Sequence, residues 1–176
     1  AVGYDMYCKL LGEAVREVKG EQVKEEIQTT VSLSVDAYIP DNYIKGENYR
    51  IEIYKRIAGI VNQQDCYDVY EEIEDRYGEV PLSVSNLIDI SYIRSMGAVL
   101  GITDITQKDD KVVLVFDKEY GNDFENIGKL CEKFGRALMY SPVNKPYLTL
   151  KVKKNEILSN VKSLLQLYKD LKKIED

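Results

Sequence analysis

Residues 101–117 read GITDITQKDDKVVLVFD, and in this stretch the chain changes from a helical to an extended pattern. Gly101 is suited to stop a preceding helix, because glycine adopts the left-handed conformation of a helix end at little steric cost. Residues 102–107 and 111–117 flank the polar turn 108–110 and are rich in apolar and β-branched residues. The stretch therefore predicts a β-hairpin that follows directly on a helix.

Helical spacing of apolar residues dominates the chain before this hairpin. Three helices are expected: one capped by Asn48, one from about Asp65 to Gly78, and one that begins near Pro81. The first of them presents an apolar face made of Ile51, Tyr54, Ile57, Ala58 and Val61. Before them, an alternation of apolar and polar residues at 31–37 predicts a strand with one buried face.

A mixed pattern follows the hairpin. A short helix is expected over 123–134, two strands over 137–140 and 147–152, and a last helix from about Asn155 to Ile174. Helices and strands therefore fall in separate blocks instead of alternating as βαβ units. The sequence predicts an α+β protein: a helical N-terminal half followed by a small mixed or antiparallel sheet with packing helices.

Composition excludes several kinds of chemistry. The chain has 176 residues, a net charge of −6 and no histidine, which argues against a histidine-based triad and a typical catalytic zinc site. No P-loop or dinucleotide-binding glycine motif is present. We therefore expect no catalytic residue, cofactor or metal in this chain. Three scattered cysteines fit a reducing cytoplasmic compartment, and no stretch is apolar enough to span a membrane.

Lysines gather towards the C-terminus, which suggests one alternative function. They are Lys151, Lys153, Lys154, Lys162, Lys169, Lys172 and Lys173. A stripe of this kind on the last helix could contact phosphates and make the chain an accessory nucleic-acid-binding domain. The same lysines are also typical of a solvated amphipathic helix, in which basic residues favour the C-terminal end.

The helix expected at 65–77 is strongly acidic, with Arg76 as its single basic residue. At about 100° per residue, Glu72, Asp75 and Arg76 share one shoulder of this helix. One interpretation is local, since Glu72 and Arg76 have the i,i+4 spacing of an ion pair within a helix. The other is a docking patch, in which carboxylates and a planar guanidinium meet a complementary charged surface. Spacing alone leaves both interpretations open.

Four blocks of sequence carry a resemblance to a known family. They are GYDMYCKLLGEAV (3–15), AYIPDNYI (37–44), RIEIYKRIA (50–58) and EEIEDRYGEVP (71–81). In order and spacing they resemble the C-terminal domain of the bacterial transcription-repair coupling factor, Mfd, up to about Ile102. Tyr77 stands where that family often has phenylalanine.

The resemblance implies a regulatory role. In that family the parent is a cytoplasmic ATPase that displaces stalled RNA polymerase at DNA damage and recruits UvrA for nucleotide excision repair. Its helicase-like DNA translocase, which uses ATP and Mg, lies upstream. The C-terminal domain is an autoinhibitory module without catalysis of its own. It docks on the N-terminal UvrB-like domain and masks the UvrA-binding surface.

The same resemblance suggests boundaries and a site for this chain. Residues 1–20 are expected to be a junction helix from the end of the translocase region, and 21–176 the regulatory domain. Glu72, Asp75 and Arg76 match the acidic and arginine positions of the family and are expected to form the interdomain latch. The expected partners are the UvrB-like domain directly, and UvrA, RNA polymerase and DNA through the parent, with no membrane.

Overall fold

The computed structural model describes residues 26–175, which form two compact units. Residues 35–92 belong to one unit, and residues 26–34 together with 93–176 belong to the other. The helix and the junction expected before residue 21 lie outside the described residues.

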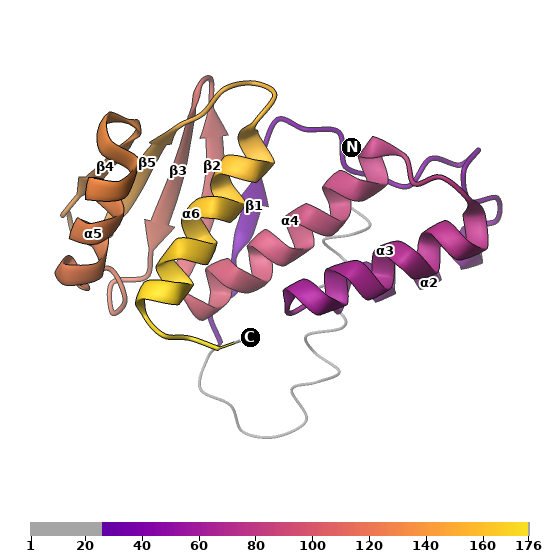
Figure 1. The fold of residues 1–176 in the computed structure, drawn as a ribbon, viewed down its shortest axis with the longest axis horizontal. Coiled ribbons are helices and arrows are strands. Elements are labelled where there is room, and N and C mark those ends of the chain that lie inside the picture. Colours follow the sequence, from indigo (N-terminus) through magenta and orange to yellow (C-terminus); the bar gives the residue numbers. More distant parts are fainter. Residues whose placement is uncertain (1–25, 176) are drawn as a thin grey trace. The chain divides into compact units, whose positions relative to one another are not determined.

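The first unit is helical (Figure 1). It contains α2 (Glu47–Ala58), α3 (Gln63–Tyr77) and the first part of α4 (Leu82–Val99). Its core comprises buried aliphatic side chains of the three helices, among them Ile53, Ile57, Val69, Ile73, Val84 and Leu87. The extended segment before α2 packs against this core, where the amide of Ile39 donates a hydrogen bond of 2.9 Å to the buried hydroxyl of Tyr54.

The α2 helix differs from the expectation in its ends. The helix is preceded by Gly46, whose carbonyl accepts the first helical hydrogen bond from Arg50, so Asn48 lies inside the first turn and is not the cap. The helix ends at Ala58, and Val61 is 65% exposed instead of being part of the apolar face. The α3 helix is capped by Asn62, whose side chain accepts a hydrogen bond from the amide of Asp65, and it ends at Gly78 as predicted.

The second unit contains a five-stranded sheet in the order β1-β2-β3-β5-β4. The strands are β1 (Thr30–Ser32), β2 (Ile102–Lys108), β3 (Lys111–Phe116), β4 (Leu138–Ser141) and β5 (Tyr147–Lys151). The β1 strand runs parallel to β2, and all other neighbours are antiparallel. The helices of this unit are the last part of α4 from Ile93 on, α5 (Phe124–Phe134), the short 3-10 helix η1 (Gly135–Ala137) and α6 (Ile157–Leu171). The predicted α+β class and hairpin are thus confirmed.

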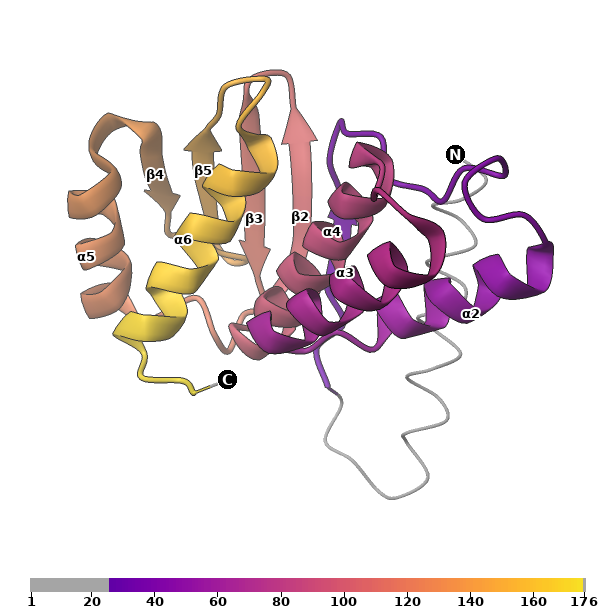
Figure 2. The same ribbon diagram turned by 45° about the vertical axis from the view of Figure 1, so that its right-hand side comes forward.

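The α5 and α6 helices lie on the same face of the sheet (Figure 2). Alternate residues of the central strands, such as Ile105, Leu114 and Leu148, are buried under this helical layer. Facing them are the buried residues of α5 and α6, namely Ile127, Leu130, Val161, Leu164, Leu165 and Tyr168. The apolar face of α6 therefore forms part of this core.

The first strand is shorter than the alternation at 31–37 predicts. Only Thr30–Ser32 pair with β2, and the amide of Ser34 already donates to the side chain of Gln107 instead of to a strand. The chain stays extended beyond that point, so Val31 and Ala37 are both buried although only Val31 is in the sheet. The residue before β1 also contacts the sheet, since the buried Thr29 hydroxyl donates a hydrogen bond to the carbonyl of Ile102 at 2.6 Å.

Gly101 makes the turn between α4 and β2. Its φ angle is +76°, in the left-handed region, and its carbonyl accepts a hydrogen bond from the amide of Asp117 at the end of β3. The ring of Tyr120 occupies the space that a Cβ atom would need at this position. Glycine is therefore required for two separate reasons, backbone conformation and packing.

We expect Gly101→Ala to lower the free energy of unfolding by about 2–4 kcal/mol, since left-handed strain and overpacking each cost about 1–3 kcal/mol. Chemical denaturation with a two-state fit measures the change. Gly128→Ala is the matched control, because Gly128 lies within α5 and a Cβ atom there meets open space. That variant should be neutral or more stable by up to about 1 kcal/mol. Equal stability of the two variants would contradict the role of Gly101.

Candidate interdomain docking site

The candidate site lies on the paired helices α2 and α3 of the first unit. Glu52 of α2 contacts Arg76 of α3, and Arg56 contacts Glu72, so residue numbers rise along one helix as they fall along the other. The two helices are therefore antiparallel, as expected for helices joined by a short connection. This arrangement places the predicted residues Glu72 and Arg76 opposite two charges that the sequence analysis did not single out.

These four side chains form a continuous charge network, in the order Arg56, Glu72, Arg76 and Glu52. One oxygen of Glu72 accepts hydrogen bonds from Nε and Nη2 of Arg56, at 2.9 and 2.8 Å. Its other oxygen is 3.3 Å from Nη1 of Arg76, which also donates to Glu52 at 2.9 Å. The charges of the two carboxylates and the two guanidinium groups in this network cancel. The hydrogen bond to Glu52 is the main reason why the pKa of Arg76 is raised above its usual value.

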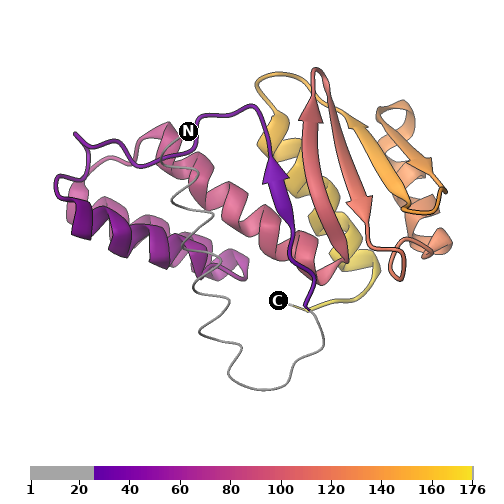
Figure 3. The same cartoon turned by 180° about the vertical axis from the view of Figure 1, so that it is seen from behind.

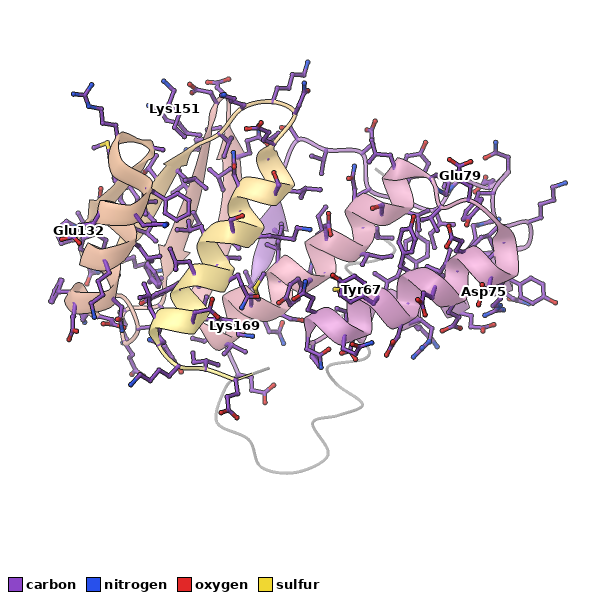
Figure 4. All side chains as sticks on the ribbon, viewed as in Figure 1. Tyr67, Asp75, Glu79, Glu132, Lys151 and Lys169 are labelled. Atoms are coloured by element: carbon purple, nitrogen blue, oxygen red, sulfur yellow. The ribbon has the colours of Figure 1, made fainter. Side chains whose placement is uncertain are left out.

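Asp75 stands apart from this network. It is exposed, and among residues 26–175 it has no hydrogen-bond or ion-pair partner. Figure 4 shows Asp75 towards the C-terminal end of α3. Glu71 and Glu74 beside it in the sequence are exposed as well. The structure thus joins two of the three predicted residues, Glu72 and Arg76, as the local interpretation of their spacing expects, and leaves the third free to meet a partner.

The sequence did contain a signal for the two residues that were missed. Glu52 and Arg56 have i,i+4 spacing within the block RIEIYKRIA, which is the spacing noted for Glu72 and Arg76. What the sequence lacked was the register between the two helices, which depends on how their buried faces meet.

An aromatic cluster supports the C-terminal end of α3. The guanidinium of Arg76 lies 5.1 Å from the ring centroid of Tyr77, a cation–π distance. The Tyr77 ring contacts that of Tyr43 edge to face, and the Tyr43 hydroxyl donates to the carbonyl of Gly78 at 2.8 Å. Burial, followed by the charge of Glu74, raises the pKa of Tyr43. The cluster holds the turn after α3 and positions Arg76.

The network and the free carboxylate should respond differently to charge reversal. We expect Arg76→Glu to lower the melting temperature, because it places a third carboxylate beside Glu52 and Glu72. Asp75→Arg should leave the free energy of unfolding within about 0.5 kcal/mol, as at an exposed position without partners. Thermal melting by circular dichroism measures both. The difference in melting temperature between the two variants should be smaller at 1 M salt, which screens exposed charges. A larger loss for Asp75→Arg would contradict this assignment.

The two tyrosines at this helix end provide a matched pair of variants. The Tyr77 hydroxyl is buried and has no hydrogen-bond partner in the described part of the chain, whereas the Tyr43 hydroxyl has one. We expect Tyr77→Phe to raise the free energy of unfolding by about 1 kcal/mol and Tyr43→Phe to lower it by about 1 kcal/mol. Denaturant titration measures the free energy of unfolding and distinguishes the expected increase in Tyr77→Phe from the expected decrease in Tyr43→Phe. A loss of stability in Tyr77→Phe would show that this hydroxyl is satisfied in solution.

The lysine-rich alternative does not form a single exposed stripe on the last helix. Lys151 lies in β5, and Lys169, although on α6, is only 3% exposed. Lys172 turns towards α5, where its Nζ lies 3.6 Å from the carboxylate of Asp123, and it lies 5.3 Å from the ring centroid of Tyr168. Side chains engaged in this way are poorly placed to contact phosphates in solution.

The described part of the chain contains neither a cluster of metal ligands nor a membrane-spanning helix. Between residues 26 and 175, His, Cys, Asp and Glu side chains do not gather in any group of three or more that could hold a metal ion. No helix within the same range combines the length and apolar character needed to cross a membrane.

Comparison with known families assigns this α+β chain to a class. The TRCF domain family matches residues 33–127, which is more than half of the chain and includes both helices of the candidate site. The chain therefore belongs to the TRCF domain family.

Individual relatives define that class further. Over 180 residues the chain is 31% identical to the transcription-repair-coupling factor of Staphylococcus aureus, covering 99% of the chain and 15% of the relative. It is 29% identical to that of Staphylococcus epidermidis over 180 residues, covering 100% of the chain and again 15% of the relative. The chain thus corresponds to a small part of these proteins.

A solved structure confirms the architecture. The crystal structure of the C-terminal domain of a transcription-repair coupling factor superposes with a TM-score of 0.78 and 24% sequence identity, covering 88% of this chain and 100% of that one. This match confirms the predicted fold, and the family match and the relatives confirm the resemblance to the transcription-repair coupling factor.

Proposed function

We propose that this chain is a non-catalytic, autoinhibitory domain of a transcription-repair coupling factor. It docks on the N-terminal UvrB-like domain of its parent, masks the surface that binds UvrA, and restrains the ATP- and Mg-dependent DNA translocase until the parent engages RNA polymerase. The observation that carries the proposal is Asp75 on the acidic helix α3, which is exposed and has no partner among residues 26–175, whereas the neighbouring Glu72 and Arg76 are engaged with Arg56 and Glu52.

The balance of charges suggests how such a contact works. Asp75 supplies a carboxylate that breaks no internal ion pair on docking, so its interaction with a cation of the UvrB-like domain is opposed by desolvation alone. Arg76 can add a contact through its unused donors, since its side chain remains 35% exposed. Glu72 orients Arg76 from the neighbouring turn. In this arrangement Asp75 makes the primary contact, Arg76 a secondary one, and Glu72 acts by positioning.

A polar contact also suits a latch that must open. Interfaces between domains of one chain are commonly polar and separate more easily than large apolar ones. Coupling is reciprocal: whatever stabilises the undocked state weakens docking by the same free energy. Binding of the parent to polymerase or UvrA would therefore be favoured by every change that weakens the contact at Asp75.

Calorimetric titration of this chain with the separately expressed UvrB-like domain of its parent tests the proposal. We expect Asp75→Arg to weaken binding tenfold or more, which corresponds to about 1.4 kcal/mol. Asp75→Arg is the decisive variant, because Arg76→Glu also disrupts the internal network. Glu132→Arg is the matched control, since Glu132 is an exposed acid on α5 of the other unit (Figure 4), and it should bind normally.

Two results would contradict the proposal at different levels. Intact binding of Asp75→Arg would move the latch to another surface. A tethered domain experiences an effective partner concentration of about 1 mM. No binding of the unmodified chain at concentrations approaching this value would argue against docking altogether.

A further inference from the structure

One face of the five-stranded sheet carries no helix of the second unit among residues 26–175. Residues that alternate with the buried ones, such as Thr106 on β2, Val113 on β3 and Thr149 on β5, point away from α5 and α6. Figure 3 shows these strands from that side, with α6 behind them. No helix of this unit, within the part of the chain that is described, lies on this face. Its side chains are therefore available to a partner.

Three lysines form a row across this face at the end that carries the hairpin turn. Lys108 on β2 is the cross-strand partner of Lys111 on β3, which in turn is the partner of Lys151 on β5. All three are exposed, and directly paired residues of neighbouring strands point to the same face. With strands about 4.8 Å apart, the row spans about 10 Å. We call these residues the lysine row, and Figure 4 shows Lys151 at this end of the sheet.

The lysine row is poorly neutralised by the protein itself. Lys151 lies 4.0 Å from the carboxylate of Asp110, with both side chains more than half exposed. Within residues 26–175, Lys108 and Lys111 have no acidic partner. Like charges placed directly opposite each other in a sheet are destabilising. An anionic ligand that crosses the strands would relieve this repulsion.

Apolar and hydroxyl-bearing side chains, together with one exposed carboxylate, Asp104, continue the same face beyond the lysine row. The next row across the sheet is Thr106, Val113, Thr149 and Met139, and the row after it is Asp104, Val115, Tyr147 and Ser141. Met139 is 66% exposed. The face therefore combines a line of positive charge with an aromatic ring and an apolar surface, all carried by rigid strands.

We infer that this face binds single-stranded nucleic acid, with phosphates on the lysine row and bases against the apolar rows. Single strands combine backbone charge with unpaired bases that can stack on aromatic and apolar side chains. A duplex would use the lysines but keep its bases inside, which would leave Tyr147 and Met139 without a role. An acidic peptide would likewise lack planar groups for this surface. The site lies in the second unit and does not depend on the proposed docking at α3.

Three phosphate contacts define the expected strength and salt dependence. The logarithm of the binding constant should fall with the logarithm of salt concentration with a slope of about −2, from about −0.7 per contact on a single strand. Raising salt from 50 to 200 mM should therefore weaken binding about 18-fold. Because the chain has a net charge of −6, we expect binding to be detectable mainly at low salt.

Fluorescence anisotropy of a labelled 20-nucleotide oligothymidylate, titrated with the full 176-residue chain, tests the inference. The double variant Lys108→Gln, Lys111→Gln should bind at least tenfold more weakly at 50 mM salt, with a slope closer to −1. Its matched control is Lys118→Gln, Lys133→Gln, which removes the same charge from exposed positions off the sheet and should bind within twofold of the unmodified chain. Circular dichroism verifies that both variants fold.

A further variant separates base contacts from charge. Tyr147→Leu keeps an apolar residue in the strand but removes the ring, so it should weaken binding about fivefold or more without changing the salt slope. The inference is overturned by no binding at 50 mM salt, by equal losses in the two lysine pairs, or by an unchanged affinity in Tyr147→Leu. Tighter binding of a 20-base-pair duplex, or displacement of the oligonucleotide by polyglutamate at a lower concentration than by unlabelled oligothymidylate, would also overturn it.

Discussion

At Gly101 the chain passes from a helix to a strand without an intervening loop, and much of the second unit depends on the backbone conformation of this residue. The left-handed φ angle ends α4 and directs the next residues into β2. Its carbonyl then accepts a hydrogen bond from Asp117, at the far end of the hairpin. The start of β2 and the end of β3 are thus held at one point, and the pairing of the hairpin follows from it.

The rest of the sheet is built on that hairpin. Strand β1 pairs with the outer edge of β2, and β5 pairs with the outer edge of β3. Segments that are distant in the sequence are therefore added on both sides of the hairpin. The helices α5 and α6 cover one face of the result. The other face is consequently composed of residues that no local pattern brings together, and the lysine row is an example.

In the first unit, charge is distributed by the antiparallel pairing of α2 and α3. Glu72 and Arg76 are drawn into a network with Arg56 and Glu52, while Asp75, one residue before Arg76, has no such partner in the described part of the chain. Neighbouring residues of the same acidic helix therefore have different electrostatic surroundings. A residue engaged in an internal pair contributes to a docking surface mainly by shape and orientation, whereas an unpaired one contributes charge.

The sequence by itself determined the class of the fold, most of the elements and the candidate residues Glu72, Asp75 and Arg76. These features depend on local chemistry: helical or alternating spacing of apolar residues, and glycine where a helix must end, as at Gly78 and Gly101. The i,i+4 contact of Glu72 with Arg76 belongs to the same group. The resemblance to the TRCF family rested on short blocks of such residues in order.

Only the tertiary structure decided which distant groups meet. The early strand is limited to Thr30–Ser32, since beyond it the amide of Ser34 donates to the side chain of Gln107 and not to the backbone of β2. Lys169 is buried although it belongs to a basic segment, and Glu52 faces Arg76 across two helices. The physical reason is that register between helices and strands is set by the packing of complete faces, which no short window of sequence contains.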